Sequence, residues 1–331
     1  MKWFRVGWLA LLLLVLVVGL PVGAQSPEKL EHLVLAGPPG PLSIPLAYLV
    51  ANDKLAEIAD DVELVLWEDQ NQLRAMIAGG QADLVTMPAN NAAIFYNNGL
   101  DVQLLDIAAW NASFGISADK SITSLADAVG KRVVIPFEGS IPDLLFQYIA
   151  TANDLNPAED FKIQYTPNPQ QAAQMIIGGQ ADVAILPEPL ATAVLLKTKD
   201  AAEPLLRAFS LSDEWTTITD DVKTPLTGTV ALPSVQDQPE VIAVFQREYA
   251  LAIAWVIENP EAAGKLAEEQ LPELGLTAKP VTLSLQQTAW EDVSAQDARA
   301  DIESFFTLLL ELSPDVVGGH LPDDDFYYGG E

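Results

Sequence analysis

The chain has 331 residues, half of them apolar, which is enough for two modest domains with a core each. Its formal net charge is −29, from 46 acidic and 17 basic residues, and so acidic a surface repels nucleic acid and anionic lipid. It contains no cysteine, which excludes disulfides, thiolate metal sites, cysteine nucleophiles and a lipid-modified N-terminal cysteine.

Residues 1–24 have the pattern of a secretory signal peptide. Lys2 and Arg5 form a short basic segment, and residues 7–20 form an uninterrupted apolar run that Pro21 ends. These 14 residues are fewer than the roughly 20 needed to span a bilayer, so cleavage after Ala24 is favoured over a retained membrane anchor. No other stretch is long and apolar enough to span, so we expect an exported protein without membrane insertion after cleavage.

From residue 33 onward, short apolar runs alternate with amphipathic segments. Strands are expected at 33–37, 62–67, 82–88 and 101–110, and helices after 41 and at 71–80 and 90–99. A second cycle follows, with helices at 124–130, 140–155 and 169–179 and strands at 131–137, 161–167 and 181–187. Short apolar strands separated by helices indicate parallel sheets that are covered on both faces.

One phrase occurs in both cycles, "MIAGGQADLVTMP" at residues 76–88 and "MIIGGQADVAILP" at 175–187, with eight of thirteen positions identical. In each copy, a glycine at positive φ can end a helix, and an aspartate precedes a buried strand that a proline ends. We interpret the phrase as the same helix-to-strand connection built once in each of two similar lobes. The shared glycines are expected to be scaffold.

The rest of the chain is expected to return to the first lobe. Residues 224–233 are extended, and the long helices at 239–259 and around 301–312 have no strand partners of their own. This predicts lobe 1 from residues 30–110 and 225–331, and lobe 2 from 111–224. The chain then crosses between the lobes twice, near 110–113 and 224–228, which makes a hinge with a cleft between the lobes.

Candidate ligand-binding residues follow the strands, because ligands of open parallel sheets bind at the carboxyl ends of the strands. Glycine and serine before a helix offer backbone N–H groups to a ligand. Asparagines can donate and accept hydrogen bonds, and glutamates fixed near strand ends can accept them. Tryptophan rings can stack against a flat ligand. The candidates are Gly40, Pro41, Ser43, Trp67, Asn90, Asn91, Trp110, Glu138, Gly139, Ser140 and Glu188. Phe114 and Phe137 are further possible stacking rings. Each candidate also has an ordinary structural interpretation, as a helix cap, a core tryptophan or a solvated carboxylate.

The sequence contains no legible catalytic set. The two histidines, His32 and His320, lie near the two ends of the mature chain, and no Ser/His/acid arrangement or phosphate-binding loop is present. The segment "GGHLPDDDFYY" near the C-terminus is interpreted as a solvated turn rather than a metal cluster. No enzyme activity, metal or cofactor is expected.

Together, the export signal, the "GGQAD" strands and the segments "MPANNAA" and "LPEPLATA" resemble a known family. The chain is similar to type II periplasmic solute-binding proteins of ABC importers, in the group that serves nitrate, sulfonates, taurine and thiamine precursors. This resemblance implies a monomer in the periplasm that closes on a small-molecule solute between its lobes. It would then deliver the solute to the permease and ATPase subunits of an importer. Without a lipoprotein cysteine, the protein is expected to be free rather than tethered.

The charges near the cleft favour a neutral or cationic solute. None of the five arginines of the mature chain lies in a loop assigned to the cleft, whereas Glu68, Glu138 and Glu188 do. Since sulfonates and carboxylates usually require an arginine or several donors, we expect a heteroaromatic solute such as a pyrimidine thiamine precursor. The alternatives are a sulfonate, taurine or nitrate ligand held by helix N-termini, an enzyme on the same fold, and a sensory protein that uses the same cleft.

Overall fold

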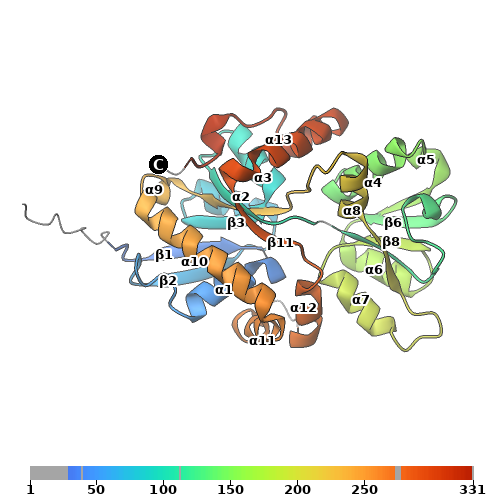
Figure 1. Ribbon diagram of the computed structural model, residues 1–331, viewed down its shortest axis with the longest axis horizontal. Coiled ribbons are helices and arrows are strands. Elements are labelled where there is room, and N and C mark those ends of the chain that lie inside the picture. Colours follow the sequence, from blue (N-terminus) through green and yellow to red (C-terminus); the bar gives the residue numbers. More distant parts are fainter. Residues whose placement is uncertain (1–28, 39, 112, 273–276, 330–331) are drawn as a thin grey trace, which may run out of the picture.

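The computed structural model describes residues 29–38, 40–111, 113–272 and 277–329 (Figure 1). The predicted signal peptide lies outside the described residues. The chain forms two lobes side by side, each built on one sheet with helices on both faces. This confirms the predicted fold class.

Lobe 1 contains a six-stranded sheet in the order β2-β1-β3-β10-β4-β11. Its strands are β1 (Leu33–Gly37), β2 (Val62–Leu66), β3 (Leu84–Pro88), β4 (Gln103–Ala109), β10 (Thr227–Ala231) and β11 (Trp290–Ser294). β1, β2 and β3 are parallel, whereas β10 runs antiparallel to both of its neighbours. β10 enters the sheet directly after the chain returns from lobe 2, and it runs opposite to β1, β2, β3 and β4.

Lobe 2 contains a five-stranded sheet in the order β7-β6-β8-β5-β9. Its strands are β5 (Phe114–Ser117), β6 (Arg132–Pro136), β7 (Lys162–Thr166), β8 (Val183–Leu186) and β9 (Leu206–Ser210). β5, the first strand after the chain leaves lobe 1, is antiparallel to β8 and β9, as β10 is to its neighbours in lobe 1. The two lobes therefore repeat one arrangement, and each sheet is mixed rather than wholly parallel.

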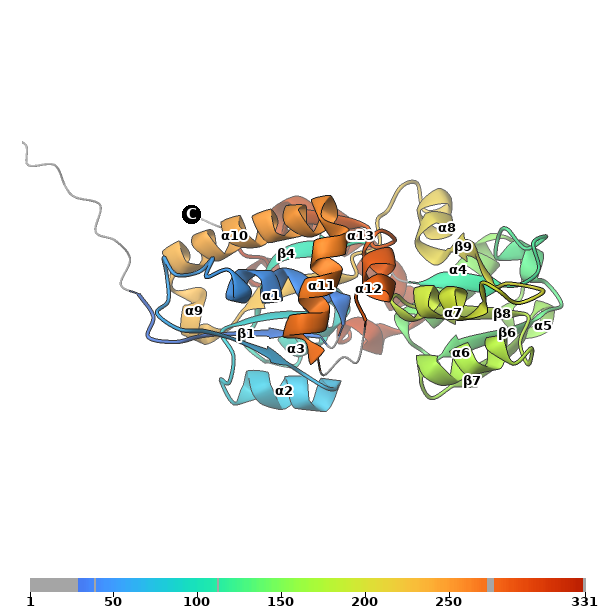
Figure 2. The same cartoon turned by 90° about the horizontal axis from the view of Figure 1, so that it is seen from below.

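Helices from distant parts of the chain complete each lobe. Those of lobe 1 are α1 (Ile44–Ala51), α2 (Gln70–Ala78), α3 (Ala89–Asn97), α9 (Pro233–Gln236), α10 (Pro239–Glu258), α11 (Pro260–Gln270), α12 (Ala278–Leu285) and α13 (Ala295–Leu312). Those of lobe 2 are α4 (Ile141–Ala152), α5 (Pro157–Asp160), α6 (Pro169–Ile177), α7 (Leu190–Thr198) and α8 (Leu211–Ile218). Short 3₁₀ helices are η1 (Pro41–Ser43), η2 (Ala126–Ala128), η4 (Pro314–Val317) and η5 (Asp324–Phe326). Figure 2 shows α12 between the lobes, where it packs against both η1 and α7.

The repeated phrase forms the same helix end in both lobes. Gly80 has φ of 59° and Gly179 has φ of 68°, a conformation that side chains disfavour. In each copy, the N–H of the following glutamine donates to the carbonyl of the methionine that opens the phrase, at 3.0 Å in lobe 1 and 2.9 Å in lobe 2. This is the hydrogen-bond pattern of a Schellman motif, and it confirms the predicted helix-to-strand connection.

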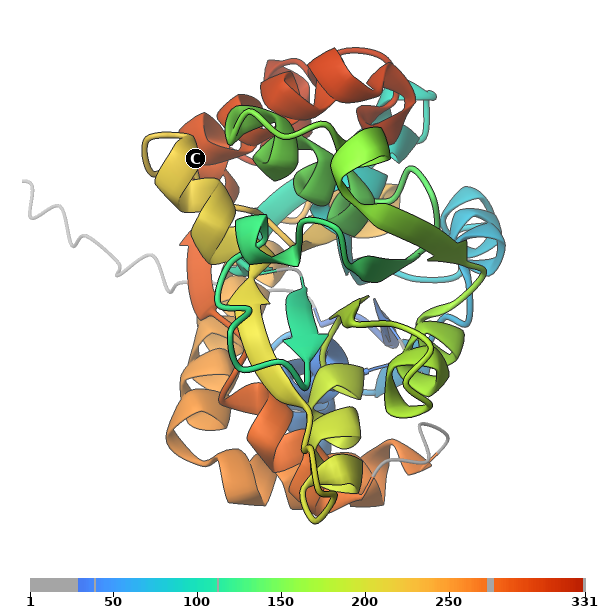
Figure 3. The same cartoon turned by 90° about the vertical axis from the view of Figure 1, so that its right-hand side faces the viewer.

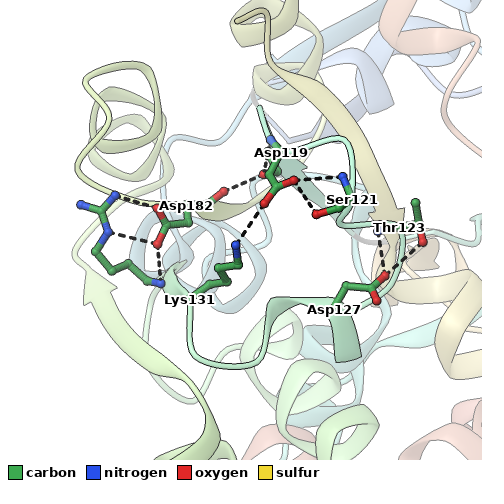
Figure 4. Close-up of polar contacts among 8 residues, drawn as sticks. Asp119, Ser121, Thr123, Asp127, Lys131 and Asp182 are labelled. Atoms are coloured by element: carbon green, nitrogen blue, oxygen red, sulfur yellow. Dashed lines mark hydrogen bonds and ion pairs between the residues drawn. The ribbon is translucent and has the colours of Figure 1, made fainter.

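The aspartate of the phrase joins two neighbouring strands at the amino edge of each sheet. Asp83 accepts a hydrogen bond from the Val34 N–H at 2.7 Å, and Asp182 accepts one from the Arg132 N–H at 2.8 Å. Figure 4 shows Asp182 near Lys131, whose ammonium group pairs with Asp119 at 3.0 Å. The carboxyl ends of the parallel strands, and not this edge, therefore face the cleft.

The two crossings lie against each other and are joined by hydrogen bonds. The Thr224 hydroxyl donates to the Trp110 carbonyl at 2.5 Å, and the Leu226 N–H donates to the Ala109 carbonyl at 2.8 Å. Beside them, the buried Trp215 of α8 contacts Phe305 of α13 edge-to-face, with ring centroids 5.4 Å apart. The lobes thus share an aromatic contact next to the hinge. Figure 3 views the molecule from the side of lobe 2, with lobe 1 behind it.

The C-terminal region differs from the prediction in two respects. It contributes strand β11, which pairs with β4, so the expectation that this region has no strand was wrong. The residues "WEDVS" gave little signal because they lack an apolar run and lie at a sheet edge. The predicted solvated turn is also wrong in part, because Phe326 and Tyr327 are fully buried against lobe 1.

Candidate ligand-binding cleft

A cavity of about 360 Å³ lies between the lobes, where the carboxyl ends of β3 and β6 face each other. Lobe 1, lobe 2 and the second crossing all contribute to it. Its lining residues are Gln70, Pro88, Asn90, Asn91, Ile94, Gly139, Ser140, Ile141, Pro142, Thr224, Pro225, Leu226, Phe305 and Val316. None of these lining residues carries a charge. The cavity therefore has no lining carboxylate that could pair with a buried cation.

Two helices begin at this cavity, one from each lobe. Neither α3 nor α4 has a side chain that caps its first turn. Among the described residues, the backbone N–H groups of Asn90 and Asn91 in α3 and of Ile141 and Asp143 in α4 have no acceptor. The free N–H groups of both helices and the positive end of the α3 dipole favour an oxyanion or another strong acceptor in the cavity. At α4, the carboxylate of Asp143 lies in the first turn and offsets the dipole.

Asn91 is the most unusual polar group in the cavity wall. Only 3 % of the residue is exposed, and its side chain takes part in no hydrogen bond with a described residue. Its neighbour Asn90 differs, because its amide donates to the Val316 carbonyl at 3.1 Å. The Asn91 amide is not among the fully enclosed side-chain groups that lack a partner, so it reaches the cavity that the residue lines. A ligand in the cavity can therefore form hydrogen bonds with it.

The loop before α4 holds the lobe 2 wall in place. Gly139 has φ of 76° and donates its N–H to the buried carboxylate of Asp143 at 2.8 Å. The Ser140 hydroxyl donates to the Pro136 carbonyl at 3.1 Å. Asp143 also accepts a hydrogen bond from the Tyr165 hydroxyl, and burial together with this carboxylate raises the pKa of Tyr165 to about 12. The cavity wall therefore rests on a fixed polar network.

A second hollow, of about 630 Å³, lies at the outer end of lobe 2 and contains the charges that the cleft lacks. There Lys131 pairs with Asp119 and Arg132 with Asp182, at 3.0 and 2.7 Å. Each of these basic groups is therefore paired with a carboxylate, and Figure 4 shows Lys131 with Asp119, beside Asp182. The interlobe cavity, with its unpartnered amide, is the stronger candidate.

Sequence comparison identifies the family. The model for periplasmic substrate-binding proteins of phosphonate ABC transporters matches residues 52–215, about half of the chain. The chain belongs to the periplasmic substrate-binding proteins of ABC importers. No curated protein sequence matches this binding protein significantly.

Solved structures share the fold of this binding protein at low sequence identity. An ABC transporter from Parabacteroides distasonis is 20% identical with a TM-score of 0.72, over 91% of this chain and 100% of that one. The periplasmic aliphatic sulphonate binding protein SsuA from Escherichia coli is 19% identical with a TM-score of 0.66, over 87% and 96%. The periplasmic nitrate-binding protein NrtA from Synechocystis PCC 6803 is 14% identical with a TM-score of 0.57, over 87% and 84%. No helix among the described residues is long and apolar enough to cross a membrane.

Four of the eleven residues predicted to bind ligand line the cavity of this binding protein, namely Asn90, Asn91, Gly139 and Ser140. Glu138, next to them in the chain, is exposed and points to no described partner. Gly40, Pro41 and Ser43 lie outside the cavity, in the turn after β1, where the Ser43 hydroxyl donates to the Pro38 carbonyl at 2.7 Å.

The two predicted tryptophan platforms are core residues. Trp67 is 7 % exposed, and its indole N–H donates to the Thr86 carbonyl at 3.2 Å. Trp110 is 6 % exposed, and its indole N–H donates to the Glu291 carbonyl at 2.8 Å. Both rings follow strands, as the sequence indicated, but both are turned into the protein.

Glu188 is engaged within lobe 2. One carboxylate oxygen pairs with the guanidinium of Arg207 on β9, and the other accepts the Thr192 N–H at 3.2 Å. Arg207 also donates to the Thr192 hydroxyl at 2.5 Å, and its guanidinium lies over the Phe114 ring, 5.2 Å from the centroid. Sequence reasoning missed Arg207 because it lies in a strand and not in a loop.

We expect Glu188→Gln to destabilise the protein more than it weakens binding. Breaking a buried ion pair costs about 3–5 kcal/mol, and we expect about 2 kcal/mol here because the Arg207 side chain is 22 % exposed. Urea unfolding of Glu188→Gln measures this loss, and the double variant Glu188→Gln/Arg207→Met should recover much of it. Unchanged stability with abolished binding would instead assign Glu188 to the ligand, as the sequence predicted.

The remaining cavity residues were not predicted. Ile141 and Pro142 directly follow Ser140, so the sequence did contain a signal for them. Phe305 and Val316 come from the C-terminal region, which packs on α3 through η4. Nothing local in the sequence indicates this contact.

Proposed function

We propose that the protein captures a small organic solute bearing an oxyanion group in the interlobe cavity and delivers it to an ABC permease. In this proposal, lobe 1 (residues 30–110 and 225–331) and lobe 2 (111–224) act as a monomer in the periplasm after signal-peptide cleavage. The observation that carries the proposal is the amide of Asn91, which reaches the cavity and has no protein partner among the described residues, beside free N–H groups at the N-termini of α3 and α4.

Three features support an oxyanion over a cation. The cavity lining contains no carboxylate, the α3 dipole presents its positive end, and Glu188 is neutralised by Arg207. The matching family model describes phosphonate transport, and two of the similar structures are described as sulphonate- and nitrate-binding proteins. The ligand class proposed here is therefore a phosphonate or sulfonate.

A neutral heteroaromatic solute, such as a pyrimidine thiamine precursor, is the second candidate. It is favoured by the uncharged cavity lining and by the half-exposed ring of Phe137, two residues before the lining residue Gly139. Asn91 can both donate to and accept from such a ring.

Isothermal titration calorimetry of the full mature chain tests these candidates. We expect micromolar or tighter binding of methylphosphonate or ethanesulfonate, and weak or no binding of an aminopyrimidine or of an organic ammonium ion. Tight binding of the aminopyrimidine alone would establish the second candidate. Mass spectrometry of the recovered probe serves as the control for turnover, because a changed mass would show an enzyme instead of a carrier.

A further inference from the structure

Phe137 has a backbone conformation that aromatic residues rarely adopt. It follows β6 with φ of 56°, in the left-handed region, where a bulky residue is an outlier. Its ring is also 50 % exposed. Of the large apolar side chains that are this exposed in the described part of the chain, Phe137 is the only aromatic one. Both features are unfavourable for folding.

The surrounding loop imposes this conformation. The Phe137 N–H donates to the Thr166 carbonyl at 2.8 Å, and its carbonyl accepts the Ser140 N–H at 3.0 Å. These bonds tie the loop to the end of β7 and to the start of α4. Asparagine or glycine would fit this backbone with less strain. The stability of the loop therefore does not explain why a phenylalanine occupies this position, and strained residues of this kind gather at ligand-binding sites.

The position of Phe137 connects it to the cavity. Phe137 is not itself a lining residue, but it lies two residues before Gly139, at which the lobe 2 wall of the cavity begins. Since the first turns of α3 and α4 are suited to an acceptor group, the rest of an organic solute extends away from them. An exposed ring in the same loop, outside the cavity, offers that part of the solute an apolar surface.

We propose that the Phe137 ring packs against the organic part of the bound solute and selects solutes with a flat or bulky apolar group. This inference rests on the proposed function. The helix N-termini and Asn91 then bind the head group, and Phe137 discriminates among the groups attached to it. The preferred substrate class is a phosphonate or sulfonate with an aromatic or branched substituent, rather than an inorganic ion or a methyl compound.

The test compares methylphosphonate with phenylphosphonate, and methanesulfonate with benzenesulfonate, by calorimetry on the wild-type chain and on Phe137→Asn. We expect the wild type to bind the phenyl compound at least tenfold more tightly than the methyl compound. Phe137→Asn should reduce this preference to less than threefold and leave methyl binding within about twofold. Because asparagine tolerates the left-handed region, the Tm of the variant should not fall.

Two controls define the role of the ring. Phe137→Tyr keeps an aromatic surface and should retain the preference, whereas Val129→Ala removes an exposed apolar side chain outside the cavity and should not alter it. Equal binding of phenyl and methyl compounds by the wild type, or a preference that survives in Phe137→Asn, would overturn the inference and leave the proposed function intact. Failure of every probe to bind the wild type would instead remove the proposed function, and the inference with it.

Discussion

Replacement of Asn91 by alanine is expected to weaken ligand binding by about 10- to 100-fold without lowering the stability of the protein. A hydrogen bond to a charged group contributes about 1.5–3 kcal/mol, which corresponds to this loss of affinity. Within the protein, however, the side chain of Asn91 makes no hydrogen bond with a described residue. Its replacement therefore breaks no such bond, and we expect the Tm of the variant to be nearly unchanged.

Asn90 provides the matched control, one position earlier in the same helix. Its amide donates to the Val316 carbonyl and joins α3 to η4. Asn90→Ala should therefore lower the free energy of unfolding by about 0.5–1.5 kcal/mol and affect binding less than Asn91→Ala. Calorimetry with the tightest probe and urea unfolding of both variants measure the two effects. A lower Tm for Asn91→Ala together with unchanged affinity would show that Asn91 is structural and contradict the proposed site.

The scaffold was predictable because it is encoded locally. Each "GGQAD" segment contains the glycine that ends a helix, and each following strand is a continuous apolar run. The same local logic led to Asn91 and Ser140, since the residue after a buried parallel strand lies at the ligand-binding edge. Strands β5, β9 and β11 were missed because they are short or lie at or near a sheet edge, where their apolar pattern is weak.

The direction of a side chain at a strand end was not predictable. Trp67, Trp110 and Glu188 all follow strands, yet each is turned toward a partner within the protein. These partners include a carbonyl 181 residues away from Trp110, in strand β11, and Arg207 on β9. Such contacts depend on which strands become neighbours in the folded sheet, and this order is not visible in a local window of sequence.

A fall in stability as pH rises from 5 to 8 is the second large effect expected, and it comes from lobe 1. Asp106 on β4 is 2 % exposed, and one of its carboxylate oxygens has no partner among the described residues. Burial, together with the nearby carboxylate of Asp292, raises the pKa of Asp106 well above its usual value. Burial also raises the pKa of Asp292 to about 6. None of the ion pairs in the described part of the chain involves either carboxylate.

The sign of the effect follows from whether the folded or the unfolded chain binds more protons. In the unfolded chain, aspartate titrates near pH 3.9, so between about pH 4 and 6 the folded chain binds more protons than the unfolded chain. The stability that these groups contribute is fully present below pH 4 and is lost as pH rises through the folded pKa values. For Asp292 alone, a pKa of about 6 corresponds to a loss of about 2–3 kcal/mol. Glu214, whose pKa is also raised by burial, acts in the same direction.

Asp106→Asn isolates the contribution of the buried pair. The asparagine oxygen can still accept the Thr229 N–H, which lies 3.1 Å from the Asp106 carboxylate, and asparagine has no charged form that burial would disfavour. We expect a higher Tm than wild type at pH 8 and a flatter dependence of Tm on pH between 5 and 8. Asp237→Asn removes one negative charge at an exposed position and should keep the wild-type slope. A wild-type Tm that rises from pH 5 to 8, or an Asp106→Asn slope equal to that of Asp237→Asn, would show that the two buried carboxyls do not share this proton-dependent role.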